Sequence, residues 1–348
     1  MKIFDGHNDI LSKLTKPPGP GNPDGFLESG AGHLDYPRAK DAGFAGGFFA
    51  VFASNSSSEP SPDLSDDGYS FPMAPPLEYE FAHDAALKMI DLLHSIEKGS
   101  KGKFEIVKDH QSLINCLEND IMAGVLHLEG AEPILPSLEN FEYFYDRGMR
   151  SLGITWSRPN KFGYGVPFKY PSSPDTGPGL TDAGKKLVKT CNEYGVLIDL
   201  AHLNEKGFWD TAEISNAPLV SSHTAACSLV PKARNLTDEQ LIAVAETNGV
   251  IGIIFSVNDL DGAIRPKKDT AISSILKHIR YIADLIGPEY VAFGSDLDGT
   301  IIPSEFGDVS GFPKLVGLMR EDGFSASELE MICYKNWLRV LKESWKAA

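Results

Sequence analysis

The chain has 348 residues, of which 42% are hydrophobic and 23% are charged, as in an ordinary globular protein. This length fits one large domain or two of ordinary size, and it allows a sizeable core without disulfide staples. The formal net charge of −16 argues against a nucleic-acid partner, because so acidic a chain has little with which to neutralise phosphates.

Eight short apolar runs, rich in β-branched and aromatic residues, predict eight β-strands. Most of them are almost continuously apolar, which is typical of parallel strands covered on both faces. In chain order the runs are residues 2–7, 44–53, 121–130, 149–156, 195–202, 218–224, 249–255 and 290–296.

Helical patterns separate these strands, and several have clear end signals. Thr181 and Thr237 are predicted N-caps, the second with Gln240 as its capping-box partner, and Gly195 and Gly249 are predicted stops. The predicted helices cover residues 81–98, 138–147, 181–194, 204–214, 237–248 and 269–286, followed by a last pair at about 312–320 and 326–344.

Eightfold alternation of strand and helix predicts an α/β fold, a (β/α)8 TIM barrel formed as a single domain over residues 1–348. Two doubly wound domains are the alternative, but the sequence contains neither a linker nor a glycine-rich dinucleotide turn. Two long loops, at about 54–80 and 157–180, each follow a strand. We therefore expect them on the barrel face that carries active sites, where they can cover a pocket.

Residues that bind metals recur at the predicted carboxyl ends of five strands. Each alone has an ordinary explanation, such as a helix cap or a hydrogen-bonded histidine, but five coincidences on one rim are hard to accept. Three imidazoles and three carboxylates exceed the needs of one tetrahedral ion and suit two ions that share a bridging carboxylate. Zn, Mn, Co and Fe all fit such ligands. The residues are His7, Asp9, Glu129, His202, His223 and Asp296.

Other polar residues fall near the same rim. Asp5, His127 and Asp298 share the inward parity of the ligands but lie a layer away, so we interpret them as supporting or barrel-filling groups. Arg234 lies on the loop after the sixth strand, where a guanidinium can grip a carboxylate through two hydrogen bonds.

The four cysteines are isolated, with no C-x-x-C pair, and we expect them to be reduced. No apolar run is long enough to cross a bilayer, and no secretory signal pattern opens the sequence. The expectation is a cytoplasmic protein with no membrane partner.

The sequence resembles the membrane (renal) dipeptidase family of zinc metallopeptidases, peptidase family M19, over nearly its whole length. The segments that carry the resemblance are "DGHNDIL", "LEGAEP", "GLTDAGKKLVKTCNEYGVLIDLAH", "SSHTAACSLVPKARNLTDEQL", "FGSDLDG" and "KNWLRVL". The resemblance implies a barrel of the metal-dependent amidohydrolase type, two Zn²⁺ per subunit, a homodimer, and hydrolysis of small dipeptides by a metal-bridging hydroxide, with a D-residue tolerated at the C-terminal position.

The same resemblance assigns roles to individual residues. His7 and Asp9 would bind one zinc ion, His202 and His223 the other, and Glu129 would bridge both. Asp296 would also bind the first ion and accept a proton from the bridging water, so Asp296 and Glu129 are the predicted catalytic residues. Arg234 would hold the terminal carboxylate of the substrate.

One position departs from the family pattern. Relatives carry a histidine, thought to polarise the scissile carbonyl, where "GITWSRPN" places Trp156. The indole N–H can donate one hydrogen bond, and Asn160 or Arg158 can substitute, so Trp156 and Asn160 join the predicted substrate-binding residues. The departure keeps two alternatives open: a related barrel metallohydrolase acting on another small amide or a lactone, and a metal-bound barrel that serves as an inactive scaffold.

Overall fold

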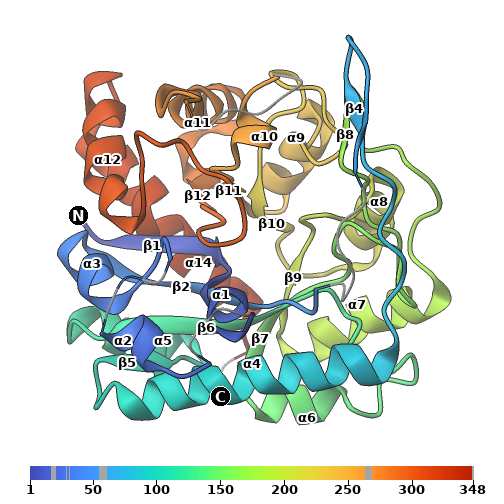
Figure 1. Ribbon diagram of the computed structural model, residues 1–348, viewed down its shortest axis with the longest axis horizontal. Coiled ribbons are helices and arrows are strands. Elements are labelled where there is room, and N and C mark those ends of the chain that lie inside the picture. The colour runs from blue at the N-terminus through green and yellow to red at the C-terminus, as the bar shows by residue number, and fades with distance from the viewer. Residues whose placement is uncertain (17–20, 29, 31, 55–60, 263–268, 347–348) are drawn as a thin grey trace.

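The computed structural model describes the whole chain except residues 17–20, 29, 31, 55–60, 263–268 and 347–348. Eight parallel strands form a closed ring in which each strand pairs with two neighbours, and β2 closes the ring against β6. The fold is thus the predicted (β/α)8 barrel (Figure 1). Around the ring the strands are β1 (Ile3–Asn8), β2 (Phe44–Val51), β6 (Met122–Glu129), β7 (Met149–Gly153), β9 (Leu197–Asp199), β10 (Val220–Thr224), β11 (Val250–Ile253) and β12 (Val291–Phe293).

The helices pack around the ring, and their ends follow local capping chemistry. Thr237 and Gln240 form the predicted capping box, and Gly195 ends its helix in the left-handed conformation at φ 69°. The long helices are α4 (Tyr79–Gly99), α5 (His110–Glu118), α7 (Asp182–Tyr194), α8 (Glu205–Ile214), α9 (Asp238–Glu246), α11 (Ser273–Ile286), α12 (Phe312–Glu321) and α14 (Asn336–Ser344). Shorter helices are α1 (Ile10–Thr15), α2 (Asp24–Leu27), α3 (Tyr36–Asp41), α6 (Phe141–Asp146), α10 (Val257–Leu260) and α13 (Ala326–Glu330). No helix among the described residues has the length and apolar character needed to cross a membrane.

The core has two layers. The larger layer fills the space between strands and helices, and the second fills the amino-terminal half of the barrel interior. Trp337 of α14 packs into this inner layer, and its indole N–H donates to the carbonyl of Phe293 at 2.9 Å. Because apolar side chains fill the amino-terminal half of the barrel interior, the polar side chains gather at the carboxyl ends of the strands.

Three expectations need correction. A short extra strand, β5 (Phe104–Ile106), pairs with β6 outside the ring, and neither it nor α5 was predicted. The predicted helix 326–344 is interrupted by a π-helical turn at Met331–Lys335. Several strands end earlier than predicted; for instance β9 stops at Asp199 and β12 at Phe293, because the residues beyond them turn into the site.

The two long loops meet in a small antiparallel sheet made of β3 (Asp63–Leu64), β4 (Tyr69–Ser70) and β8 (Lys169–Tyr170). In this sheet Tyr69 is paired with Tyr170, so segments about a hundred residues apart in sequence lie side by side. Figure 1 shows this extension rising beside the barrel. No strands were predicted within these two loops. We call the small sheet formed by β3, β4 and β8 the cover sheet.

Candidate metal centre and substrate pocket

The six predicted metal ligands gather at the carboxyl end of the barrel. They come from β1, β6 and β10 and from the turns that follow β1, β9 and β12. Asp9 occupies the N-cap position of α1, yet its side chain makes no capping hydrogen bond. His202 and Asp296 have positive φ values of 64° and 60°, a conformation that costs energy in residues other than glycine and that clusters at functional sites.

Glu129 lies at the centre of this group. Its Oε2 atom is 3.7 Å from Nε2 of His7, and its Oε1 atom is 3.2 Å from Nε2 of His202 and 3.8 Å from Nε2 of His223. The Nε2 atoms of His202 and His223 are 3.1 Å apart, and His7 lies 3.5 Å from Asp9. The two carboxylate oxygens of Glu129 therefore face different histidines: Oε2 faces His7, and Oε1 faces His202 and His223.

Hydrogen bonds fix how His223 presents its ring. The hydroxyl of Ser222 donates to Asp199 at 2.5 Å and also lies 2.7 Å from Nδ1 of His223. Because the hydroxyl has only one proton, Nδ1 of His223 must be the donor in the second bond. The lone pair on Nε2 then points toward Glu129 and His202, which is how an outer group orients a metal-binding histidine.

The donor set fits divalent cations. Both ring nitrogens of His7 and one oxygen of Asp9 are buried without a hydrogen-bond partner among the described residues. Buried polar atoms without partners are costly, and lone pairs that converge between 3.1 and 3.8 Å repel one another unless a positive charge lies among them. Two groups satisfy the proximity expected of metal ligands: His7, Glu129 and His223, and His7, Asp9 and Asp296.

Burial and neighbouring charges shift the pKa values of Asp296 and Glu129 in opposite directions. Burial, reinforced by the nearby carboxylates of Asp9 and Glu129, raises the pKa of Asp296 well above its ordinary value, although His7 opposes the shift. Burial also disfavours the charged form of Glu129, but His7 and His202 outweigh it and hold the pKa of Glu129 well below its ordinary value. The two predicted catalytic carboxylates thus differ in their electrostatic surroundings.

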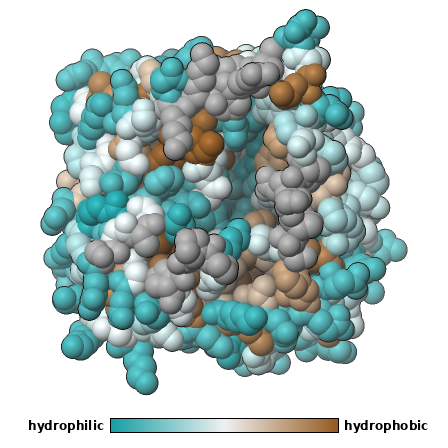
Figure 2. All heavy atoms as spheres, in the orientation of Figure 1, coloured by the Kyte–Doolittle hydropathy of each residue, from teal (hydrophilic) through white to brown (hydrophobic). Residues whose placement is uncertain are grey.

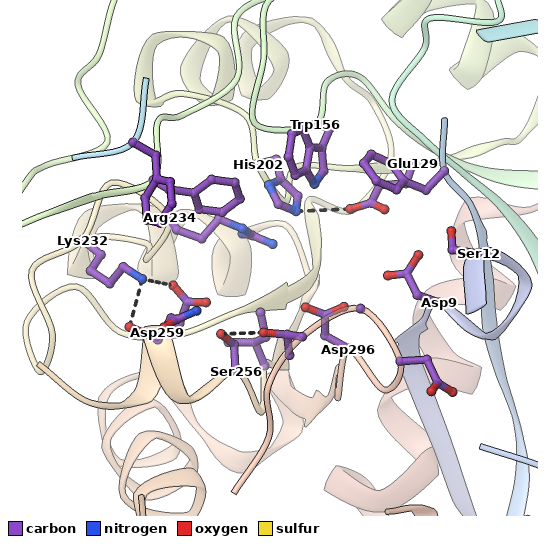
Figure 3. Close-up of a pocket in the computed structure, with 18 of the residues that line it drawn as sticks. Asp9, Ser12, Glu129, Trp156, His202, Lys232, Arg234, Ser256, Asp259 and Asp296 are labelled. Carbon is purple, nitrogen blue, oxygen red and sulfur yellow. Dashed lines mark hydrogen bonds and ion pairs between the residues drawn. The ribbon is translucent and has the colours of Figure 1, made fainter. Parts of the chain in front are cut away.

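A pocket of about 510 Å³ opens beside these residues (Figure 3), and Figure 2 shows the same face of the molecule hollowed near its centre. Asp9, Glu129, His202, Asp296, Arg234 and Lys232 all line the pocket, and Figure 3 shows Asp9 and Glu129 at one end with Lys232 and Arg234 toward the other. An apolar wall, much of it contributed by the two long loops, consists of Phe52, Pro62, Leu64, Phe71, Trp156 and Phe168.

Arg234 is buried and uses only part of its guanidinium within the protein. Its Nη2 atom donates to the carbonyl of His223 at 2.7 Å. Figure 3 shows the guanidinium directed toward the middle of the pocket. The predicted carboxylate-binding arginine and the metal ligands therefore share one cavity.

The segment "GITWSRPN", which follows β7, contains three residues predicted or considered for substrate binding, and the structure places them differently. Trp156 lines the pocket and packs beside His202, with ring centroids 5.8 Å apart. Asn160 is placed otherwise than predicted: its amide donates to Ile154 and accepts from Phe162 and Gly163, so it builds a turn outside the pocket lining. Arg158 is buried against Glu132 and the carbonyl of Ala53.

The residues interpreted as supporting groups all have protein partners. Asp5 accepts two hydrogen bonds from Ser295, His127 pairs with Ser151, and Asp298 accepts the backbone N–H groups of His33 and Leu34. Sequence reasoning missed Ser157, which bonds Nδ1 of His202 at 2.7 Å, and Ser222. The only signal for them is a serine placed beside a rim segment, as in "SSHT".

A barrel whose carboxyl rim collects imidazoles and carboxylates in this way defines a metal-dependent hydrolase. The whole chain, residues 1–348, matches the membrane dipeptidase family, peptidase family M19, and belongs to it. The protein is thus an enzyme of the metallo-dipeptidase class, which hydrolyses peptide bonds.

Solved structures and a curated relative agree with this assignment. A metallo peptidase from Rhodobacter sphaeroides, solved with a phosphinate mimic of the dipeptide L-Ala-D-Ala, is 38% identical, with a TM-score of 0.94 over 99% of each chain. The dipeptidase AC is 40% identical, with a TM-score of 0.94 over 100% of this chain and 99% of that one. Dipeptidase tcpJ of Claviceps purpurea (strain 20.1) is 27% identical over 350 residues, covering 97% of this chain and 76% of the relative.

Proposed function

We propose that this enzyme hydrolyses small dipeptides that have a free C-terminal carboxylate, using two zinc ions. The observation that carries the proposal is the joint placement of Glu129, between two groups of ligands, and Arg234 in one pocket. The phosphinate dipeptide mimic bound by the Rhodobacter sphaeroides relative supports the same substrate class and makes a C-terminal D-residue a natural candidate.

In this proposal His7, Asp9 and Asp296 would hold one ion, His202 and His223 would hold the other, and Glu129 would serve both. When bound, such a pair of ions supplies a hydroxide at neutral pH and polarises the scissile carbonyl. The separation of the two oxygens of Glu129 toward His7 and toward His202 is what supports a bridge rather than a single-ion site. Imidazole mixed with carboxylate suits zinc, and Mn, Co and Fe are alternatives for the metal analysis.

The remaining roles belong to side chains at the pocket wall. Asp296 accepts the proton of the attacking water and returns it to the leaving amine. Arg234 binds the carboxylate of the substrate with the donors that it does not use on His223. Both residues line the same pocket, so together they would fix which end of the dipeptide reaches the metals.

Trp156 is the proposed contact for the substrate carbonyl. Its indole N–H has no hydrogen-bond partner in the described part of the chain, whereas the indoles of Trp337 and Trp345 donate to backbone carbonyls at 2.9 and 3.0 Å. The ring is fixed between Phe52 and Phe168, at centroid distances of 5.0 and 5.4 Å. A donor already held in place at a water-excluded site stabilises developing negative charge without reorganisation.

The test is initial-rate hydrolysis of a dipeptide panel by zinc-reconstituted protein, with bound metal counted in the same samples. The panel pairs L-L with L-D dipeptides and includes C-terminal carboxamides. Fast cleavage that requires the free carboxylate is the expected result. Absence of cleavage with two ions bound would reject the dipeptidase proposal in favour of another small amide or a lactone, and absence of any hydrolysis would favour the scaffold. The homodimer and the cytoplasmic location stay predictions, and light scattering tests the first.

A further inference from the structure

A second cation, Lys232, lies at the same end of the pocket as Arg234 but differs in how it is bonded. Its ammonium is buried and donates to the carboxylate of Asp259 at 2.7 Å and to the carbonyl of Asn258 at 2.9 Å. Tyr69 lies beside the same ammonium, with the ring centroid 5.5 Å from Nζ. Two of the three ammonium donors are therefore bonded to Asp259 and Asn258, and the phenol ring of Tyr69 is the next neighbour, so Lys232 is held by protein groups.

Asp259 lies under the influence of both cations. Lys232 and then Arg234 outweigh the effect of burial and lower the pKa of Asp259. Burial lowers the pKa of Arg234, and Asp259 is the neighbour that opposes this most, ahead of Asp199 and Asp296. Figure 3 shows Lys232 bonded to Asp259, with the Arg234 guanidinium extending away from that pair into the pocket. One carboxylate is thus available to two cations, and the structure pairs it with lysine.

We infer that Lys232 is a positioning residue for substrate binding, because by holding Asp259 it leaves the guanidinium of Arg234 free for the substrate carboxylate. The same lysine contacts Tyr69 of β4, so the pairing also seats the cover sheet over this end of the pocket. The inference rests on the proposed role of Arg234 and adds to it the group that keeps that arginine available.

The buried charge of Asp259 determines how variants of Lys232 should behave. Removing Lys232 alone leaves Asp259 as a buried charge without its partner, and Arg234, the other cation that acts on Asp259, is the one that the substrate needs. Removing both members of a buried pair is far less damaging than removing one. Lys232→Met should therefore impair carboxylate binding, and Lys232→Met with Asp259→Asn should restore it.

The experiment compares a dipeptide with its carboxamide, using zinc-reconstituted protein in both cases. In wild type the ratio of the two kcat/KM values measures how strongly the enzyme selects a free carboxylate. We expect Lys232→Met to lower this ratio about tenfold, mainly through a higher KM for the free acid, with bound metal unchanged. The double variant should return to within about threefold of wild type, and Tyr69→Phe should lower the ratio by about threefold.

The matched control is Lys206→Met, which removes the lysine of an exposed Lys–Asp pair (Nζ to Asp210 Oδ1, 3.0 Å) outside the pocket and should leave the ratio unchanged. Equal losses on both substrates, or a double variant as impaired as the single one, would overturn the inference. If Lys232→Met does not fold, the same ratio of kcat/KM values is measured for the double variant and for Tyr69→Phe, and these two variants test the inference. An unchanged ratio in Arg234→Lys would reject the proposed carboxylate clamp itself, whereas a changed ratio there with none in Lys232→Met rejects only the role of Lys232.

Discussion

The Lys232–Asp259 pair and the group formed by His7 and Asp9 lie toward opposite ends of the pocket and are both buried, but their polar atoms are satisfied in opposite ways. At one end Lys232 donates to Asp259 and to the carbonyl of Asn258, and Tyr69 lies beside it. At the other end both ring nitrogens of His7 and an oxygen of Asp9 lack hydrogen-bond partners in the described part of the chain. Burying unpaired polar groups costs free energy, so the unpaired atoms of His7 and Asp9 favour a site that a ligand completes. The Lys232–Asp259 pair is complete within the protein, whereas the proposed metal would complete the group around His7.

The largest expected effect comes from breaking the unpaired end at its centre. Glu129→Ala removes the carboxylate that faces both ligand groups, so both ions should be lost and turnover should fall by at least about a thousandfold. Elemental analysis of the purified variant, after equilibration with zinc, measures the metal directly. Full retention of both ions would contradict the bridging assignment.

A smaller and more selective effect is expected from crowding one ligand group. A Cβ built at Gly299 meets carboxylate oxygens of both Asp9 and Asp296, so Gly299→Ala should displace ligands of the first ion and leave His202 and His223 in place. We expect bound metal to fall from two ions to one, with activity down by about a hundredfold. Gly317→Ala is the matched control, because a Cβ there meets nothing within 4 Å. Equal metal content in both variants would contradict the proposed division of ligands.

The difference between the two ends also explains how much could be predicted from sequence. Continuous apolar runs placed the eight barrel strands, and the carboxyl end of a parallel barrel is shared by all of them, so His7, Glu129 and His223 could be brought together without coordinates. Direct hydrogen bonds between loops follow no such rule. The contact of Lys232 with Tyr69 depends on how the segment around β4 folds back, and no periodicity encodes it.

Short elements were missed for related reasons. β5 has three residues and β3, β4 and β8 have two each, and these strands exist only through their pairing with distant segments. Asn160 was assigned to the substrate because its chemistry suits a carbonyl, but asparagine also satisfies backbone groups in turns, and here it does so with both ends of its amide. Residue type alone does not separate these two uses.

Two adjacent serines, one bonded to a proposed metal ligand and one without a partner, test the comparison of paired and unpaired polar groups further. Ser222→Ala removes the group that fixes the ring of His223, and we expect zinc affinity at the His202–His223 position to fall about 10- to 100-fold. Ser221→Ala is the control, since the hydroxyl of Ser221 is buried with no partner among the described residues and should cost nothing to remove. Competition with a chelator measures the affinities. Equal affinities in the two variants would remove Ser222 from the metal site.

The smallest effect on activity is expected from His278, a buried histidine that, unlike His7, has partners for both nitrogens. Nδ1 accepts the N–H of Ala226 at 3.1 Å, and Nε2 lies 3.3 Å from the carbonyl of Leu260. Burial lowers the pKa of His278 from 6.5 to about 4. The unfolded chain therefore binds a proton between those values while the folded chain does not, so this contribution to stability is complete above pH 6.5 and is lost as the pH falls toward 4.

His278→Gln replaces this histidine with a residue that can accept the same N–H but does not titrate. Between pH 7 and pH 4 the wild type should lose about 3 kcal/mol more free energy of unfolding than the variant does. Urea unfolding of both proteins across that range measures the difference, and acid effects on the metal ligands cancel because they are common to both. If the free energies of unfolding of the two proteins fall equally between pH 7 and pH 4, the pKa of His278 is the same in the folded and the unfolded chain, which would contradict the prediction. Near-equal turnover of the two proteins at pH 7 would distinguish His278, which acts on stability, from the proposed metal-binding histidines at the rim.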